Sequence, residues 1–245
     1  HVQKVFLRFT GNIYIDKITS SLIEEFKLNR IKSVKPVSFN LEFRHLKAMF
    51  EKAVKWQYNE YNPFRDVKQI KIKNSNLPKY LTKDEVRKLL DTIHDIDFQN
   101  LIIFYLYTGC RRGEALNLTW KDVDLRNRVI TIRETKSGES RTIPINEILF
   151  DLLSALKNNG SFVFRFKPCF VTHKFKAYLK LADIEGWKAL SLHNLRHTFA
   201  SHLVMAGRDL YTVGKLLGHS SVTVTQMYAH LAPDHLRSSV EGLRY

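Results

Sequence analysis

The sequence predicts a mainly α-helical protein of two domains, the second with a small β-hairpin sheet. Three patterns indicate this fold class. Residues 39–58 place apolar side chains at helical spacing, and residues 98–109 are apolar on nearly every side, as in a buried helix. The segments NRVITIRE and RTIPI each alternate apolar and polar residues, which is typical of paired strands. With 245 residues, 44% of them hydrophobic, the chain can bury two modest cores.

The chain is strongly basic. Its formal charge is +15, and residues 1–79 alone carry 16 Lys and Arg against 7 Asp and Glu. Such an excess predicts a polyanionic partner, with nucleic acid as the first candidate and a merely solvated basic surface as the alternative. There is no run of 18 apolar residues and no recognisable secretory signal, and Cys110 and Cys169 offer no disulfide framework. We therefore expect a cytoplasmic, nucleoid-associated protein without a membrane segment.

Residues 1–73 are predicted to form the first, helical domain. The segment Ile18-Thr19-Ser20 is expected to open a helix with a hydroxyl side chain as its N-cap. In residues 39–58 we predict a buried stripe at four-residue spacing, widened by neighbouring apolar side chains: Leu41, His45, Met49 and Ala53, with Phe43, Leu46 and Phe50. Basic side chains around this stripe are predicted to contact DNA phosphates, although a solvated helix face would account for some of them: Arg44, Lys47, Lys52 and Lys55.

Residues 74–80 are predicted to form a linker, because the segment is polar and basic and Pro78 disfavours helix at the preceding residue. The second domain, residues 81–245, opens with a T-x-x-E capping box made by Thr82 and Glu85. Its buried helix at 98–109 is expected to stop at Gly109.

The second domain places basic residues at several expected turns and helix faces. Arg111 and Arg112 directly follow the end of the buried helix. The hairpin, with Gly138 at its turn, carries Lys136 at its tip, where an isolated lysine is most often simply solvated. Helices are predicted at 146–158 and 170–183, and the second of these offers three lysines to DNA phosphates: Lys174, Lys176 and Lys180.

The stretch from 190 to 228 has the residues best suited to chemistry. His193 and Arg196 stand three apart on one helical face and can point at one small target. A guanidinium matches phosphate oxygens, an imidazole exchanges protons near neutral pH, and the hydroxyl of Tyr228 can act as a nucleophile. Such a set suits phosphoryl transfer without a metal. His193 and His197 also resemble half a zinc site, but no HExxH glutamate or third ligand is evident, and lone helical histidines such as His197 and His202 are more often satisfied core or surface residues.

Several separated motifs, in the same order, resemble the tyrosine recombinases, a family of phage integrases and Xer-type recombinases. The motifs span about residues 80–245: TGCRRGEALNLTWKDVD at 108–124, TKSGESRTIPI at 135–145, HNLRH at 193–197, LLGHSS at 216–221, and Tyr228 before AHL. The resemblance implies that residues 1–73 are a helical core-binding domain that clamps DNA. It also implies that residues 81–245 are an α+β catalytic domain.

The resemblance further implies a role for each residue of the site. Three side chains would bind the scissile phosphate: Arg111, Arg196 and His219. Tyr228 would attack the phosphorus, His193 would accept or relay its proton, and Lys136 would protonate the departing 5′-oxygen. Glu114 would hold the first arginine in place. Arg112 has no counterpart in the family, and Glu139 stands where many relatives carry a basic residue.

The implied activity is that of a site-specific recombinase, which cleaves and rejoins DNA strands through a 3′-phosphotyrosine intermediate without metal, ATP or other cofactor. The implied partners are double-stranded DNA and further copies of the chain, assembled as a tetramer on two duplexes. A type IB topoisomerase uses related chemistry, but the TGCRRGEAL block and the compact size favour a recombinase. A non-catalytic DNA-binding protein with a relic site is the alternative of another class. Integration, excision and resolution of DNA all stay open as biological roles.

Overall fold

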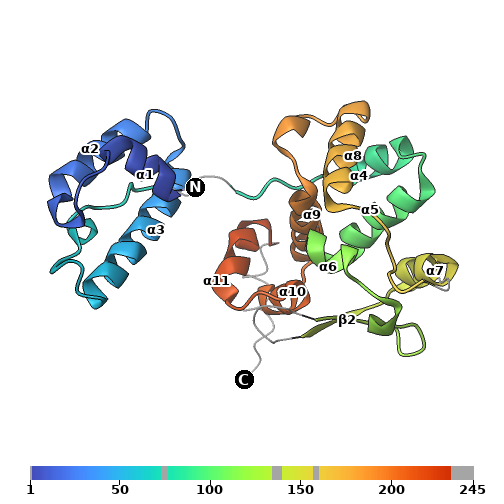
Figure 1. Cartoon of the computed structure of the whole chain (residues 1–245). Helices are drawn as coiled ribbons and strands as arrows, with labels where there is room; N and C mark the ends of the chain where they lie inside the picture. Colours follow the sequence, from blue (N-terminus) through green and yellow to red (C-terminus); the bar gives the residue numbers. More distant parts are fainter. Residues whose placement is uncertain (1, 73–76, 134–139, 157–159, 233–245) are drawn as a thin grey trace, which may run out of the picture. The chain divides into compact units, whose positions relative to one another are not determined.

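The structure, a computed structural model, describes residues 2–72, 77–133, 140–156 and 160–232. The chain divides into two compact units, residues 1–75 and 76–245 (Figure 1). The division falls inside the predicted linker. The mainly helical architecture with one small antiparallel sheet, predicted from the sequence, is confirmed. None of the helices in the described part of the chain has the length and apolar character needed to cross a membrane.

The first unit is built from three helices around an aromatic core. The helices are α1 (Val2–Thr10), α2 (Ser20–Arg30) and α3 (Pro36–Lys55), with short 3-10 turns at Ile15–Lys17 and Pro63–Arg65. The predicted hydroxyl N-cap of α2 is Thr19, whose hydroxyl accepts a hydrogen bond from the backbone N–H of Leu22 at 3.3 Å. Most of the core side chains are phenylalanines, which meet edge-on or tilted: Phe6, Phe26, Phe39, Phe43, Phe50 and Phe64.

Helix α3 buries four residues of the predicted stripe, Phe43, Leu46, Phe50 and Ala53, but the prediction was wrong for the other three. The residues at 39, 43, 46, 50 and 53 are buried, whereas Leu41 is 47% and Met49 38% exposed and His45 is also exposed. At about 100° per residue, each four-residue step drifts by about 40°, so a run of such steps winds around the helix. Alternating steps of four and three stay on one face, and the phenylalanines follow that spacing.

The opposite side of α3 carries the four basic residues, Arg44, Lys47, Lys52 and Lys55, which together form the α3 basic face. Arg44, Lys52 and Lys55 are exposed and Lys47 is half-buried. The ammonium of Lys52 lies 5.5 Å from the ring centre of Trp56. These cations therefore point away from the core of the unit rather than flanking a buried stripe.

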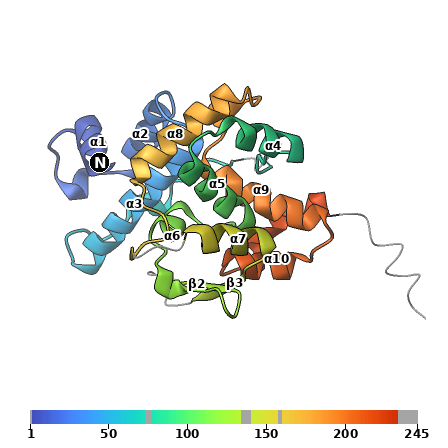
Figure 2. The same ribbon diagram turned by 90° about the vertical axis from the view of Figure 1, so that its right-hand side faces the viewer.

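The second unit surrounds one buried helix, α5 (Ile96–Thr108), which contacts α4 (Lys83–Thr92), α7 (Glu147–Leu156) and α9 (Leu192–Met205) (Figure 2). The remaining helices are α6 (Arg112–Leu116), α8 (Pro168–Leu181), α10 (Leu210–Leu217) and α11 (Val222–Thr225), with 3-10 turns at Trp120–Asp122, Trp187–Ala189 and Gln226–Leu231. The predicted capping box of α4 is present, since Thr82 and Glu85 hydrogen-bond each other's backbone N–H.

The sheet of the second unit has three strands in the order β1 (Val123–Asp124), β2 (Val129–Ile132) and β3 (Arg141–Pro144), all antiparallel. Ile130 pairs with Ile143, and both are buried against the main core. Strand β3 contacts α10, so the sheet lies next to the LLGHSS motif at the end of that helix (Figure 1). The predicted turn at Gly138, the tip residue Lys136 and the tail that starts at Pro233 lie outside the described residues.

Gly109 ends α5 as predicted, in the left-handed conformation with φ of 61°. A Cβ at this position would lie 2.4 Å from the ring of Phe199, so both the backbone angle and the space require glycine here. Cys110, directly after Gly109, is still buried in the core. The turn at Gly109 places Arg111 at the start of α6.

Candidate active site

Arg111 is the N-cap of α6, and Glu114 in the first turn of that helix holds it. The Glu114 carboxylate accepts hydrogen bonds from the backbone N–H of Arg111 at 2.7 Å and from its guanidinium at 2.8 Å. Another guanidinium nitrogen of Arg111 donates to the carbonyl of Gly218 at 3.3 Å. These bonds orient the Arg111 side chain, which is 42% exposed.

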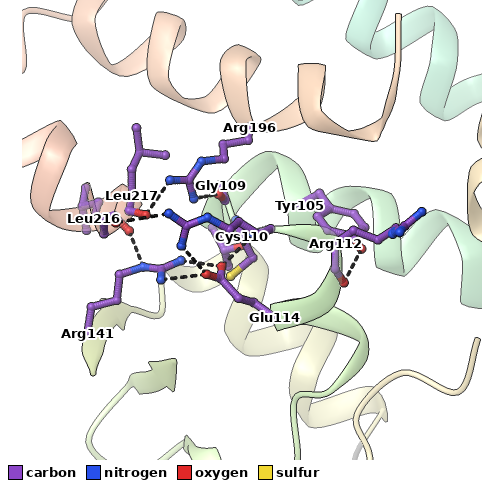
Figure 3. A network of polar contacts seen from close by, with 12 residues as sticks. Tyr105, Gly109, Cys110, Arg112, Glu114, Arg141, Arg196, Leu216 and Leu217 are labelled. Atoms are coloured by element: carbon purple, nitrogen blue, oxygen red, sulfur yellow. Dashed lines mark hydrogen bonds and ion pairs between the residues drawn. The ribbon is translucent and has the colours of Figure 1, made fainter. Parts of the chain in front are cut away.

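Arg141, the first residue of β3, completes the same network from the sheet (Figure 3). Its guanidinium forms a fork with the Glu114 carboxylate at 2.7 and 3.1 Å, and its Nε donates to the carbonyl of Leu216 at 2.9 Å. The side chain is only 9% exposed. Gly218 allows this close approach, because a Cβ there would lie 2.8 Å from the Arg141 side chain. Arg141 thus ties the sheet to α6 and to the end of α10.

Glu114 keeps its charge within this network. Burial by itself raises the pKa of the carboxyl, but hydrogen bonds from Arg141 and Arg111 outweigh burial and lower the pKa to about 2. The carboxylate is therefore ionised at neutral pH. It offsets part of the positive charge of the two arginines while fixing their positions.

Arg196 of α9 is 3% exposed and lies beside Gly109 and Leu217 (Figure 3). Its guanidinium donates to the carbonyls of Gly109 at 2.8 Å and Leu217 at 2.6 Å. These carbonyls lie at the C-terminal ends of α5 and α10, where the helix dipoles favour a cation. Burial, and then the nearby charge of Arg111, lower the pKa of Arg196 to about 10, so it stays charged at neutral pH. Arg111, Arg141 and Arg196 form what we call the arginine cluster.

Two of the predicted histidines lie close enough to the arginine cluster to respond to its charge. His219 follows the end of α10, and its Nδ1 is 2.9 Å from the hydroxyl of Thr225. Burial, followed by the charges of Arg196 and Arg111, lowers the pKa of His219 to about 4. The same causes in the same order lower the pKa of His193, whose side chain lies on the exposed side of α9. Both rings are therefore mainly neutral at pH 7.

Tyr228 lies in the 3-10 turn at Gln226–Leu231 and is 1% exposed. Its ring packs in a small core with apolar residues of α9 and α10: Ala200, Val204, Val213 and Leu217. The hydroxyl lies 2.6 Å from Nδ1 of His197. Burial raises the pKa of Tyr228 to about 12, and the charge of Arg196 is near enough to oppose this shift.

The structure brings most of the predicted catalytic side chains into one neighbourhood: Arg111, Glu114, His193, Arg196, His219 and Tyr228. Lys136, the predicted general acid, lies outside the described residues. Two residues of this neighbourhood were not assigned from the sequence. Arg141 had no distinguishing signal beyond its place in the RTIPI strand. His197 stands four residues after His193, on the same side of the helix, and that spacing was the available signal.

Two of the three lysines of α8 that were predicted to contact DNA phosphates have partners within the protein. Lys174 binds Asp95, the N-cap of α5, and its ammonium lies about 5 Å from the rings of Phe98 and Phe170. Lys176 donates to the carbonyl of Lys188 at 2.6 Å. These contacts occupy hydrogen-bond donors of both ammonium groups, so the geometry does not favour phosphate contacts by Lys174 and Lys176. DNA binding by these two lysines stays a prediction.

His193 and His197 were considered from the sequence as half of a zinc site. The rings of His193 and His197 are 4.8 Å apart and nearly perpendicular. In the part of the chain that the structure describes, no group of three His, Cys, Asp or Glu side chains is placed to hold a metal ion.

Comparison with known proteins shows the family of the chain. Residues 79–235 match the Phage integrase family. The integrase of Haemophilus phage HP1 is 34% identical over 95% of this chain and 67% of that protein, and the tyrosine recombinase XerA of Pyrococcus furiosus is 34% identical over 86% and 76%. This chain therefore belongs to the phage integrase family, the tyrosine recombinases. It spans about two thirds of the length of the phage integrases that it matches.

Solved structures show the same relationship. The catalytic domain of the bacteriophage HP1 integrase is 34% identical and superposes with a TM-score of 0.58, over 66% of this chain and 94% of that one. A structure of the Tn1549 transposon integrase with transposon right end DNA matches in fold over 98% of this chain and 90% of that one, with a TM-score of 0.79 and 24% identity. The fold shared with the Tn1549 integrase thus covers both units.

Proposed function

We propose that this chain cleaves and rejoins DNA strands at specific sites through a 3′-phosphotyrosine intermediate. The observation that carries the proposal is the arrangement of Arg111 and Arg196 beside Tyr228. The two guanidiniums are oriented by backbone carbonyls and, at Arg111, by the carboxylate of Glu114. A single phosphodiester is the natural ligand for such a site.

The arginines would lower the barrier to attack on the phosphodiester. Negative charge builds up on the non-bridging oxygens, and Arg111 and Arg196 are held in place before the substrate arrives, which is the form of stabilisation that contributes most to rate. His219 would add a donor. If the Thr225 hydroxyl donates to Nδ1, the proton of the neutral ring is on Nε2, which can then donate to the same phosphate.

Tyr228 is the proposed nucleophile and would form the covalent bond to the 3′-phosphate. Because burial raises its pKa, its proton has to be removed as attack proceeds, and His193 is proposed as the base or proton relay. Lys136 is proposed to protonate the 5′-oxygen that leaves. The phosphotyrosine bond conserves the energy of the broken phosphodiester, so rejoining to another strand needs neither metal nor ATP.

The proposed partners are double-stranded DNA and other copies of the chain, assembled as a tetramer on two duplexes. The exposed cations of the α3 basic face and the net charge of +15 support DNA binding by the first unit as well as by the second. The structure of the Tn1549 integrase with DNA supports the same view.

Whether the reaction serves integration, excision or resolution depends on the target site. The free thiols of Cys110 and Cys169 support a cytoplasmic location.

A nicked suicide duplex tests the proposed function directly, since the cleaved strand diffuses away and the covalent adduct accumulates. The wild-type protein should form an adduct that resists denaturation. Tyr228→Phe should bind the duplex within about twofold of wild type and form none. Adduct formation by Tyr228→Phe would move the nucleophile elsewhere, and the exposed Tyr211 serves as the control position. No adduct from the wild-type protein on any cognate duplex would favour a DNA-binding protein with a relic site.

A further inference from the structure

Tyr228 and His197 are in direct contact through their polar atoms. The phenol oxygen lies 2.6 Å from Nδ1 of His197, and the two rings are tilted by 53° with centroids 5.9 Å apart. The tyrosine is 1% exposed, so its hydroxyl needs a partner within the protein. The phenol hydrogen is satisfied when it points to an unprotonated Nδ1, which leaves the proton of the neutral imidazole on Nε2.

A second imidazole lies beside the first. His193 precedes His197 by one turn of α9, and the ring centroids are 4.8 Å apart at an interplanar angle of 89°. His197 is half-buried and His193 is exposed. The two rings therefore lead from the buried hydroxyl toward the solvent-exposed side of α9, next to Arg196.

We propose that His197 is the first acceptor of the Tyr228 proton in strand cleavage, with His193 as the relay toward solvent. The inference rests on the proposed function and adds a catalytic residue to it. As the bond from the Tyr228 oxygen to phosphorus forms, the Tyr228 O–H bond breaks and its proton moves to Nδ1 of His197. The bond from phosphorus to the 5′-oxygen breaks, and that oxygen takes a proton from the general acid. Rejoining reverses both transfers, so no co-reactant is consumed.

Without DNA the proton stays on the tyrosine. Burial raises the pKa of Tyr228 to about 12. Burial, and then the proximity of His193, Arg196 and His219, lower the pKa of His197 to about 4. A bound phosphodiester would offset the positive charge of Arg196 and so favour a protonated imidazole. The geometry thus links activation of the nucleophile to the arrival of its substrate.

The variant His197→Gln distinguishes two roles of His197, a hydrogen bond to the Tyr228 hydroxyl and acceptance of the Tyr228 proton. The amide oxygen of glutamine can still accept a hydrogen bond, but it cannot take a proton near neutral pH. We expect DNA affinity within about twofold of wild type and adduct formation slower by about 10²–10³-fold at pH 7. The remaining rate should rise about tenfold per pH unit up to about pH 9, because the phenolate fraction does so below the pKa.

A more acidic nucleophile provides the second measurement. A ring-fluorinated tyrosine at position 228 ionises without a base more readily than tyrosine does. It should speed adduct formation by His197→Gln at least tenfold and leave the protein with His197 intact unchanged or slower. If His197→Gln cleaves at the wild-type rate at pH 7, His197 does not accept the proton. If His197→Gln is slow but neither pH nor fluorination restores it, the role of His197 is structural.

Two comparisons keep these outcomes distinct. His202→Gln changes another histidine of α9, one whose ring lies 6.2 Å from that of Tyr80, and it should cleave at the wild-type rate. His197→Asn is a second variant should the glutamine lower the unfolding temperature. The proposed function fails when the wild-type protein forms no adduct, and the assignment of Tyr228 as nucleophile fails when Tyr228→Phe still forms one. The inference alone fails when Tyr228 is required and His197 is not.

Discussion

The α3 basic face and the arginine cluster both present positive charge, but they hold it in different ways. On α3 the cations extend from a helix whose other side is packed with phenylalanines, and three of the four are exposed. In the arginine cluster, Arg141 and Arg196 are nearly buried, and each guanidinium donates to fixed acceptors from other elements.

This difference predicts different work for the two sets. Exposed, flexible cations exchange counterions for phosphates and contribute affinity that depends on salt. Guanidiniums fixed before the substrate arrives can stabilise charge that develops only in the transition state, and that contributes to rate. Substitutions on the α3 basic face should therefore change mainly DNA affinity, and substitutions in the arginine cluster should change mainly the cleavage rate.

The largest expected effect concerns Lys136, the proposed general acid. Lys136→Ala should slow adduct formation on ordinary DNA by about 10³–10⁴-fold. On DNA whose scissile 5′-bridging oxygen is replaced by sulfur, most of the rate should return, because a thiol has a pKa of about 8.5 and leaves as a thiolate without protonation. Single-turnover rates on both duplexes provide the measurement. Equal impairment on the two substrates would assign the general acid to another group.

Arg196→Lys should have the next largest effect and respond differently to sulfur. Lysine keeps the charge but loses the planar fork that reaches both carbonyls, so we expect adduct formation to fall by about 10²–10³-fold. The sulfur substrate should not restore the rate, because charge on the non-bridging oxygens is unchanged. DNA affinity, measured in the same buffer, should fall by no more than about fivefold. An equal loss of affinity and rate would contradict the proposal that the arginine cluster acts mainly on rate and the α3 basic face mainly on affinity. Arg208→Lys, on an exposed arginine after α9, is the matched control.

Glu114 should make stability depend on acid pH. Its pKa is about 2 in the folded protein against an ordinary value of 4.5, so its contribution is complete above about pH 4.5 and is lost as the pH falls toward 2. The shift corresponds to roughly 3 kcal/mol. Glu114→Gln should therefore have a lower free energy of unfolding at pH 6 and a smaller change between pH 4.5 and 2.5, measured by urea unfolding.

The exposed Glu60 supplies the control for that experiment. Glu60→Gln should leave the pH dependence of unfolding close to that of the wild-type protein. If Glu114→Gln and Glu60→Gln behave alike, the carboxylate between Arg111 and Arg141 does not hold the cluster together.

The smallest expected effects are on the α3 basic face. Replacing Lys52 and Lys55 by glutamine should reduce the slope of log affinity against log salt by about 0.9 for each phosphate that the protein no longer neutralises. Adduct formation from saturated complexes should stay within about twofold of wild type. Lys17→Gln, which changes an exposed lysine outside α3, is the control and should leave the slope unchanged. A reduced cleavage rate at saturation would show that this face also takes part in catalysis.

The sequence by itself determined the family, the helical class of the fold and the identity of most of the proposed site. These conclusions depend on local chemistry. A capping box such as Thr82 with Glu85, or a glycine such as Gly109 that must adopt a positive φ, marks a helix end within a few residues. The order of the motifs then identified Arg111, Arg196 and Tyr228 without any distance.

The tertiary structure alone decided which side chains meet. The sequence predicted Phe43 and Phe50 as core residues together with Leu41 and Met49. Only the phenylalanines are buried, because a helix buries the side that meets its neighbours. Likewise, Arg141 contacts Glu114 only because β3 folds back against α10, and His197 contacts Tyr228 across 31 positions of sequence. Such contacts depend on how separate elements pack, and no local pattern of residues records that packing.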